Sequence, residues 1–196
     1  MTLNVVKLDD VAAQSWRNGG GVTRELLKWP NADDWTLRLS VADIEKDGPF
    51  SAFPGVQRWI VALTGAGMEL GDPFNFRIEP GVAPYRFQGE YAPMCTLIDG
   101  STRDLNLMIN ERCATGWLRR IVSDNASTEN GLWLATREPQ SVDLRGIFSW
   151  AGFKLRTPRD SVVVPPRSLV WSQNDVREWH ISDIADGWGF QCTLTI

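Results

Sequence analysis

Short stretches in which apolar and polar side chains alternate are the feature that most limits how this chain can fold. Residues 35–41 alternate strictly, with Arg38 and Ser40 on one face and apolar side chains on the other. Residues 104–109 do the same, with Asn106 on the polar face. A period of two is typical of a β-strand with one buried face, so both stretches predict strands.

Further short apolar stretches are separated by turn-forming Gly, Pro and Asn residues. They lie at residues 59–63, 74–78, 85–87, 95–98, 117–122, 132–136, 161–164, 169–171 and 189–196. Many short strands at close spacing predict an antiparallel sandwich or barrel. Residues 9–16 are the best candidate for a helix, of one or two turns after Asp9 or Asp10.

A weak internal repeat indicates two barrel-like halves. Residues 76–87 align with residues 161–171 at an offset of 85, and both read as strand, proline turn, strand. We therefore expect an N-terminal half over residues 1–112 that carries the functional pocket. A C-terminal half over residues 113–196 would pack closely on it.

Composition excludes several classes of protein. The chain of 196 residues has a net charge of −4 and no basic block longer than Arg119-Arg120, which argues against a nucleic-acid partner. The three cysteines are widely spaced, which predicts neither a disulfide framework nor a thiolate zinc site. Because we find neither a signal-like leader nor a membrane-spanning stretch, we expect a cytoplasmic protein without a membrane partner.

The densest group of candidate functional residues is the loop in which Arg17 and Asn18 precede Gly19, Gly20 and Gly21. Consecutive glycines indicate left-handed backbone or the close approach of another group to the main chain. Their N–H groups, beside the donors of Arg17 and Asn18, would suit an anion-binding nest. A tight turn between a helix and a strand explains the same residues, and both interpretations stay open.

A second candidate is the loop at residues 48–58, which leads into an apolar stretch. Arg58 enters this stretch as its only charge. It is therefore either a surface charge or a guanidinium that points inward. Arginine is the cation best shaped to hold a carboxylate, because it presents a rigid fork of donors.

Four motifs in this order and spacing resemble those of the HutD/Ves family. They cover roughly the first 110 residues, and together they are specific although each alone is weak. The motifs are Trp16-Arg-Asn-Gly-Gly-Gly-x-Thr-x-Glu25, Trp35-x-x-Arg-x-Ser-x-Ala-x-Ile44, Gly48-x-Phe-Ser-x-Phe-Pro-Gly-x-x-Arg58 and Asp104-x-Asn-x-Met108. The C-terminal half carries no motif of this kind.

The resemblance implies an all-β, cupin-like (RmlC-type) jelly-roll barrel, arranged as a bicupin with a degenerate second half. It also implies a connection to histidine utilisation or stress response. Metal-binding cupins need three or four convergent ligands. Here the glutamate position falls on Arg58, and the histidine positions fall near Ser51, Phe53 and Tyr85. The chain's one histidine, His180, lies far away, so we expect neither a metal nor a cofactor.

We therefore predict a metal-free cupin-like protein that binds a small anionic metabolite, a carboxylate of the urocanate or formylglutamate type. Its role would be sensing or regulation rather than turnover. The predicted ligand-binding residues are Arg17, Asn18, Gly19, Gly20, Arg38, Ser40, Arg58 and Asn106.

The alternative is a metal-independent isomerase, lyase or hydrolase of the same anions. It would use Glu25 or Tyr85 for proton transfer. An ion pair between Glu25 and Arg17, Arg38 or Arg58 explains Glu25 without catalysis. Cupin relatives often pair their barrels, so a homodimer is compatible with the sequence.

Overall fold

The computed structural model describes residues 2–122, 132–133, 141–175 and 177–195, and its fold is all-β as predicted. These residues divide into two compact units. The N-terminal unit is Val11–Arg112, and the C-terminal unit combines Met1–Asp10 with Cys113–Ile196. The expected N-terminal half began at residue 1, whereas the structure places the first ten residues with the C-terminal unit.

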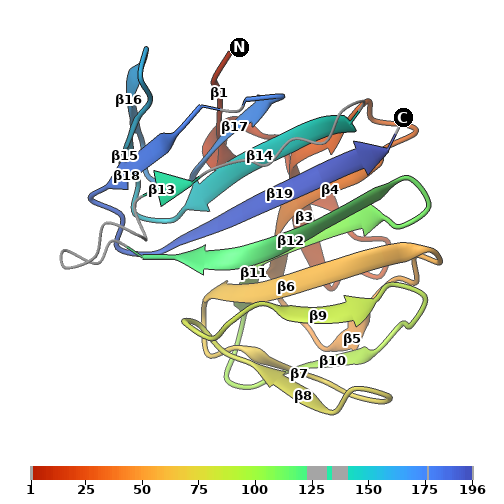
Figure 1. Cartoon of the computed structure of the whole chain (residues 1–196). Coiled ribbons are helices and arrows are strands. Elements are labelled where there is room, and N and C mark those ends of the chain that lie inside the picture. Colours follow the sequence, from red (N-terminus) through yellow and green to blue (C-terminus); the bar gives the residue numbers. More distant parts are fainter. Residues whose placement is uncertain (1, 123–131, 134–140, 176, 196) are drawn as a thin grey trace. The chain divides into compact units, whose positions relative to one another are not determined.

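Two antiparallel sheets form the N-terminal unit (Figure 1). The larger sheet has the order β2-β3-β4-β11-β6-β9, and the smaller has the order β5-β10-β7-β8. The strands of the larger sheet are β2 (Gln14–Ser15), β3 (Gly21–Trp29), β4 (Leu37–Ile44), β11 (Thr102–Asn110), β6 (Val56–Thr64) and β9 (Tyr85–Gln88). Those of the smaller sheet are β5 (Gly48–Pro49), β10 (Met94–Leu97), β7 (Met68–Leu70) and β8 (Phe76–Ile78).

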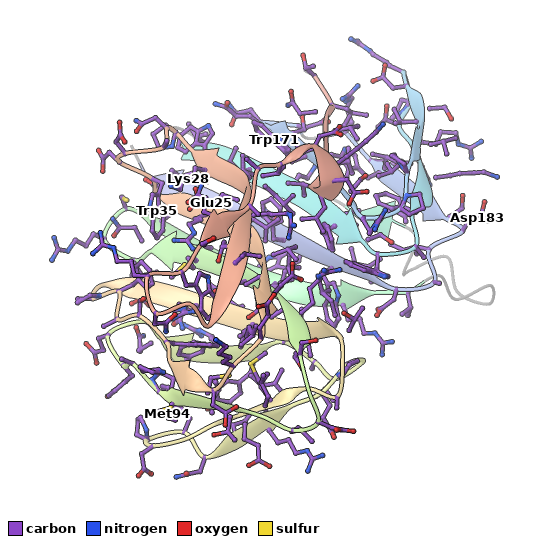
Figure 2. All side chains as sticks on the ribbon, turned by 180° about the vertical axis from the view of Figure 1, so that it is seen from behind. Glu25, Lys28, Trp35, Met94, Trp171 and Asp183 are labelled. Atoms are coloured by element: carbon purple, nitrogen blue, oxygen red, sulfur yellow. The ribbon has the colours of Figure 1, made fainter. Side chains whose placement is uncertain are left out.

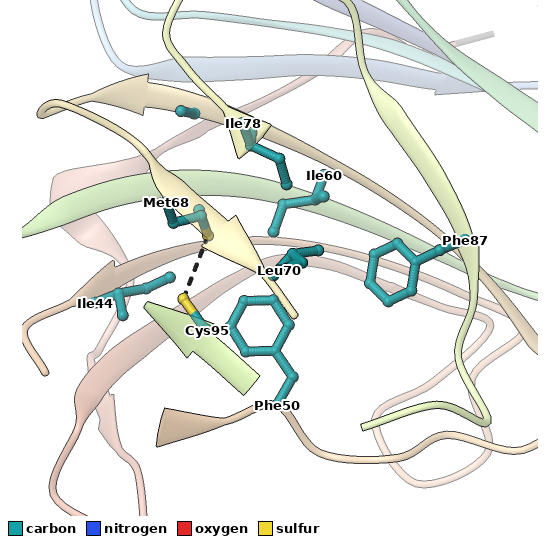
Figure 3. Packing of buried hydrophobic residues seen from close by; sticks show 9 residues of the cluster. Ile44, Phe50, Ile60, Met68, Leu70, Ile78, Phe87 and Cys95 are labelled. Carbon is teal, nitrogen blue, oxygen red and sulfur yellow. Dashed lines mark hydrogen bonds between the residues drawn. The ribbon is translucent and has the colours of Figure 1, made fainter. Parts of the chain in front are cut away.

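The core of the N-terminal unit lies between these two sheets. Figure 3 shows Ile44, Ile60 and Phe87 of the larger sheet converging on Met68 and Leu70 of the smaller one. All five side chains are buried. Ile60 lies level with Asn106, and Phe87 lies level with Arg58, so the apolar core adjoins the polar residues of the same inward face.

The C-terminal unit repeats the same strand order. Its β12-β19-β14-β17 sheet corresponds to β4-β11-β6-β9, and β13-β18-β15-β16 corresponds to β5-β10-β7-β8. Its strands are β1 (Asn4–Lys7), β12 (Ala114–Ile121), β13 (Leu132–Trp133), β14 (Ser141–Ser149), β15 (Phe153–Arg156), β16 (Ser161–Val164), β17 (Ser168–Gln173), β18 (Trp179–Ser182) and β19 (Gly187–Thr195). The internal repeat seen in the sequence coincides with the consecutive strands β8 and β9 and with β16 and β17, and in both cases the chain passes from one sheet of its unit to the other.

The start of the chain differs from the sequence-based expectation. The helix expected at residues 9–16 is wrong: Leu8–Asp10 form one 3-10 turn, and Gln14–Ser15 pair with β3 as β2. Strand β1 pairs with β17 in the C-terminal unit, from Asn4 opposite Trp171 to Lys7 opposite Ser168. These pairings use the backbone groups that an isolated helical turn would leave without partners.

Two further points concern the extent of the strands and the membrane. Of the strand predicted at residues 132–136, the part at 134–136 lies outside the described residues.

The described part of the chain contains no helix that is long and apolar enough to cross a membrane.

Candidate functional site

The inward face of β4, β11 and β6 carries the polar residues in ordered rungs. Strand pairing sets Arg38, Met108 and Arg58 level with one another. We call Arg38 and Arg58 the arginine end. The next rung contains Ser40 and Asn106.

One rung further along, Asp104 lies level with Ala42 and Ala62. The alternation of side chains in a strand is the reason for this arrangement. Residues of the opposite face, Leu39 and Leu107 among them, are fully buried.

Arg58 points inward, so of its two interpretations the structure supports the buried guanidinium. Only 5% of the residue is exposed, and its guanidinium carbon lies 5.3 Å from the ring centre of Phe50 and 4.8 Å from that of Phe87. Its Nη1 donates to the backbone oxygen of Ser51 at 3.3 Å. Burial lowers the pKa of Arg58 to about 10, opposed by Asp104, so the group stays cationic at neutral pH.

Arg38 supplies the second cation of the arginine end. Its guanidinium lies 5.9 Å from the Trp35 ring and 5.7 Å from the Phe53 ring. Its Nε lies 3.4 Å from the Glu25 carboxylate. Burial lowers the pKa of Arg38, and the charges of Glu25 and Asp104 act in the opposite direction.

Glu25 is held by neighbouring polar groups. On β3 it lies level with Ser40, and its carboxylate lies 2.9 Å from the ammonium nitrogen of Lys28, which Figure 2 labels beside it. Gln14 also donates to it at 3.2 Å. The ion pair expected from the sequence is therefore present with Arg38, and Lys28 is a partner that the sequence did not reveal.

These side chains surround a cavity of about 680 Å³. The cavity brings together six of the eight predicted ligand-binding residues: Arg17, Asn18, Arg38, Ser40, Arg58 and Asn106. Its wall also contains Glu25, together with the aromatic side chains of Trp16, Phe50 and Phe53. The cavity is thus cationic at one end and has apolar walls.

The glycine loop behaves as a turn. Gly19 has a left-handed φ of 65°, and its N–H donates to the Trp16 oxygen at 3.0 Å. The N–H of Gly20 donates to Asn18 Oδ1, also at 3.0 Å. A Cβ on Gly21 would lie 2.2 Å from the Asp43 oxygen, so β4 approaches too closely for any other residue. The loop uses the N–H groups of Gly19 and Gly20 itself, and neither glycine lines the cavity.

Neither of the other two candidates from the sequence lies at the cavity. Tyr85 stacks on Phe76 with ring centres 3.9 Å apart, beside the core cluster, and does not line the cavity. His180 is an exposed residue of the C-terminal unit, and its Nε2 lies 3.5 Å from the Glu178 carboxylate. Tyr85 is thus excluded as a group that reacts inside this cavity.

Asp104 is the functional candidate that the sequence reasoning missed. It lines the cavity, is 2% exposed, and its Oδ1 has no hydrogen-bond partner among the described residues. Desolvation raises the pKa of Asp104 to about 7, although Arg58, a backbone hydrogen bond from Ala42 and Arg38 act to lower it. The sequence pattern could have identified Asp104, because it lies two positions before Asn106 and therefore on the same face of the strand.

The raised pKa of Asp104 predicts a dependence of stability on pH. The folded state holds this proton more tightly than the unfolded state, in which the pKa is 3.8. Stability therefore falls as pH rises from about 4 to about 7 and is level above that, with a loss of at most about 4 kcal/mol. Between pH 5 and pH 8, urea unfolding should show about 3 kcal/mol of this loss in the wild type and a much smaller loss in Asp104→Asn. An identical loss in both proteins would contradict the assignment.

The C-terminal unit contains a comparable arginine that already has a carboxylate. Arg145 lies on β14, the counterpart of β6, and is 1% exposed with its guanidinium carbon 4.2 Å from the Trp179 ring. Its Nη2 lies 3.6 Å from Asp175 Oδ1. Arg177 also donates to both oxygens of Asp175, at 2.8 Å and 2.7 Å. The chain itself thus supplies the anion in this unit.

The donor set of the cavity does not fit the metal that many cupins hold. A divalent cation needs several carboxylate, imidazole or thiolate ligands, whereas three arginines line this cavity together with its two carboxylates. In the described ranges no group of three or more His, Cys, Asp or Glu side chains is placed to hold a metal ion. We therefore assign no metal chemistry to the cavity.

Comparison with solved structures supports the jelly-roll fold. HutD from Pseudomonas fluorescens SBW25 matches with a TM-score of 0.77 and 23% identity, over 100% of both chains. A conserved protein of unknown function from Pseudomonas aeruginosa PAO1 matches with a TM-score of 0.77, 23% identity, and 99% and 98% coverage. A cupin 2 conserved barrel domain protein from Leptotrichia buccalis has a TM-score of 0.52 at 10% identity, with 98% and 96% coverage.

Comparison of sequences adds the family. A curated Pseudomonas putida protein, described as an uncharacterized 21.2 kDa protein in the hutC 3' region, is 40% identical over 111 residues. The match covers 54% of this chain and 57% of that relative, so it spans little more than half of the relative's length. The sequence model of the HutD family matches residues 8–143, which is more than half of this chain. The chain therefore belongs to the HutD family.

Proposed function

We propose that this protein binds a small carboxylate, without a metal ion, in the cavity of its N-terminal unit. The observation that carries this proposal is the contrast between two buried arginines. Arg145 is paired with Asp175 of its own chain, whereas Arg58 forms no ion pair with any carboxylate in the described ranges. A buried cation beside an open cavity favours an anionic occupant.

The arginine end has the chemistry to hold a carboxylate. Arg58 is fixed among aromatic rings, so little side-chain entropy remains to be lost when a ligand binds. Arg38 lies on the same rung and adds a second set of donors. Each charge-assisted hydrogen bond from these groups contributes on the order of 1.5–3 kcal/mol.

The family connection suggests which carboxylates to try first. The Pseudomonas putida relative lies in the hutC 3' region. We therefore propose a link to histidine utilisation, with a ligand of the urocanate or formylglutamate type and a sensing role. Sensing is favoured over turnover because Lys28, Arg38 and Gln14 hold Glu25, and because Tyr85 lies outside the cavity.

Thermal unfolding of the chelator-treated protein tests this proposal. At a urocanate or N-formylglutamate concentration 100 times the Kd, stability should rise by about 2.7 kcal/mol, which corresponds to roughly 5–11 °C in Tm for a chain of this size. Sodium chloride at the same ionic strength is the control. Multiple turnover of either compound would replace sensing with the enzymatic alternative. A lack of stabilisation by these compounds and by acetate would contradict carboxylate binding.

A further inference from the structure

Two buried acceptor atoms lie in the cavity away from the arginine end. Asp104 is 2% exposed and Asn106 is 8% exposed, and both line the cavity. The Oδ1 atoms of both residues are buried without a hydrogen-bond partner among the residues that the structure describes. We call these two residues the acceptor end. A buried acceptor that lacks a hydrogen-bond partner is energetically unfavourable, so each of these two atoms calls for an explanation.

The arginines do not satisfy these acceptors. Arg58 donates a hydrogen bond to the backbone oxygen of Ser51 at 3.3 Å, and the Nε of Arg38 lies 3.4 Å from the Glu25 carboxylate. The charges of both arginines act to lower the pKa of Asp104, but neither arginine forms a hydrogen bond with its Oδ1. The two Oδ1 atoms are thus not satisfied by the guanidinium groups of the arginine end.

Strand geometry sets how far apart the two ends are. Successive inward-facing residues of a strand are roughly 7 Å apart. Asn106 is one such step from the rung of Arg38 and Arg58, and Asp104 is two steps from it. A carboxylate held at the arginine end therefore leaves room for a second polar group of the same ligand at the acceptor end.

We propose, building on the carboxylate binding described above, that the cavity selects carboxylates that also carry an O–H or N–H donor at their opposite end. The donor hydrogen-bonds to Asp104 and Asn106. The carboxylate end supplies affinity through the arginines, whereas the donor end determines specificity. A ligand that presents an acceptor or an apolar group there offers neither Oδ1 atom a hydrogen bond. A site built to receive a donor discriminates strongly against analogues that lack one.

Two ring compounds of nearly equal shape test the specificity. In 4-hydroxyphenylacetate a hydroxyl donor lies across the ring from the carboxylate, and in 4-fluorophenylacetate a fluorine without a donor replaces it. Titration calorimetry at pH 8 should show the hydroxyl compound binding at least tenfold more tightly. The ratio of the two affinities should fall to about twofold or less in Asp104→Ala and also in Asn106→Ala. The wild-type comparison stands even if one of these variants does not fold.

Asp43→Ala is the matched control. Asp43 is the neighbour of Ala42 on β4, with opposite parity, and it pairs with Arg24 and Arg103 rather than lining the cavity. Its removal also deletes one carboxylate from the same sheet. The preference for the hydroxyl compound should persist in this variant, so that a loss confined to Asp104 and Asn106 identifies the acceptor end.

The outcomes separate this inference from the proposed function. Equal binding of both ring compounds would overturn the selection for a donor and leave carboxylate binding intact. Stabilisation by acetate with no binding of either ring compound would do the same. A preference that survives in both cavity variants would place the recognition elsewhere and overturn the inference. A failure of every carboxylate to bind would remove both claims.

Discussion

Replacement of Arg58 by methionine is expected to weaken carboxylate binding by at least about 100-fold. Methionine retains an unbranched apolar stem but removes the guanidinium group that lies over Phe50 and Phe87, together with its charge and donors. The loss of one or two charge-assisted hydrogen bonds, at about 1.5–3 kcal/mol each, accounts for an effect of this size. Titration with acetate or urocanate measures it directly.

Arg86→Met is the matched control for this variant. Arg86 is an exposed residue of β9, and its guanidinium carbon lies 5.6 Å from the Trp59 ring on the other face of the same sheet. The Arg86→Met variant loses the same charge and the same kind of aromatic contact, but Arg86 does not line the cavity. Its affinity for carboxylates should match the wild type. Undiminished binding by Arg58→Met would show that the arginine end has been wrongly assigned.

A second large effect is expected in the C-terminal unit, where Asp175→Ala should lower the free energy of unfolding by about 3–5 kcal/mol. The substitution leaves Arg145 buried without its carboxylate, and an uncompensated buried charge carries a penalty of this order. It also removes the acceptor of the Trp179 indole N–H, which lies 3.2 Å from Asp175 Oδ2. Urea unfolding followed by tryptophan fluorescence would measure the change.

An exposed ion pair of the same unit provides the comparison. Arg120 and Asp186 lie 2.9 Å apart with about two fifths of each side chain exposed. Pairs of this kind contribute little, so Asp186→Ala should change stability by less than about 1 kcal/mol. Similar losses in Asp175→Ala and Asp186→Ala would mean that the Arg145 charge is compensated by other groups.

Sequence patterns predicted the strands best where only one face is polar. The alternation in residues 35–41 and 104–109 identified which side chains of each strand share a face, and the structure adds that Ser40 lies level with Asn106. The pattern is decisive because a strand has a period of two, so each residue's face follows from its neighbours. Residues 9–16 gave no such constraint, and there the predicted helix was wrong.

Arg58 could not be placed from the sequence because β6 is buried on both faces. Its neighbours Gln57 and Trp59 are as buried as Arg58 itself, so the period of two carries no information there. The pairing of Arg145 with Asp175 could not be predicted either, because the two residues are thirty positions apart and only the folded structure brings them together. Asp104 could have been found, because its alternation with Asn106 was already evident.

The pairing of β1 with β17 constrains how this chain can be made. The segment Asn4–Lys7 is synthesised more than 160 residues before the strand that it joins, Ser168–Gln173. The hydrogen-bonding edge of β1 therefore lacks this partner until β17 has been made. Because this contact spans more than 160 positions, closing it is costly in loop entropy and will come late in folding. A nascent chain thus completes the β1-β17-β14-β19-β12 sheet only after β17 has been synthesised.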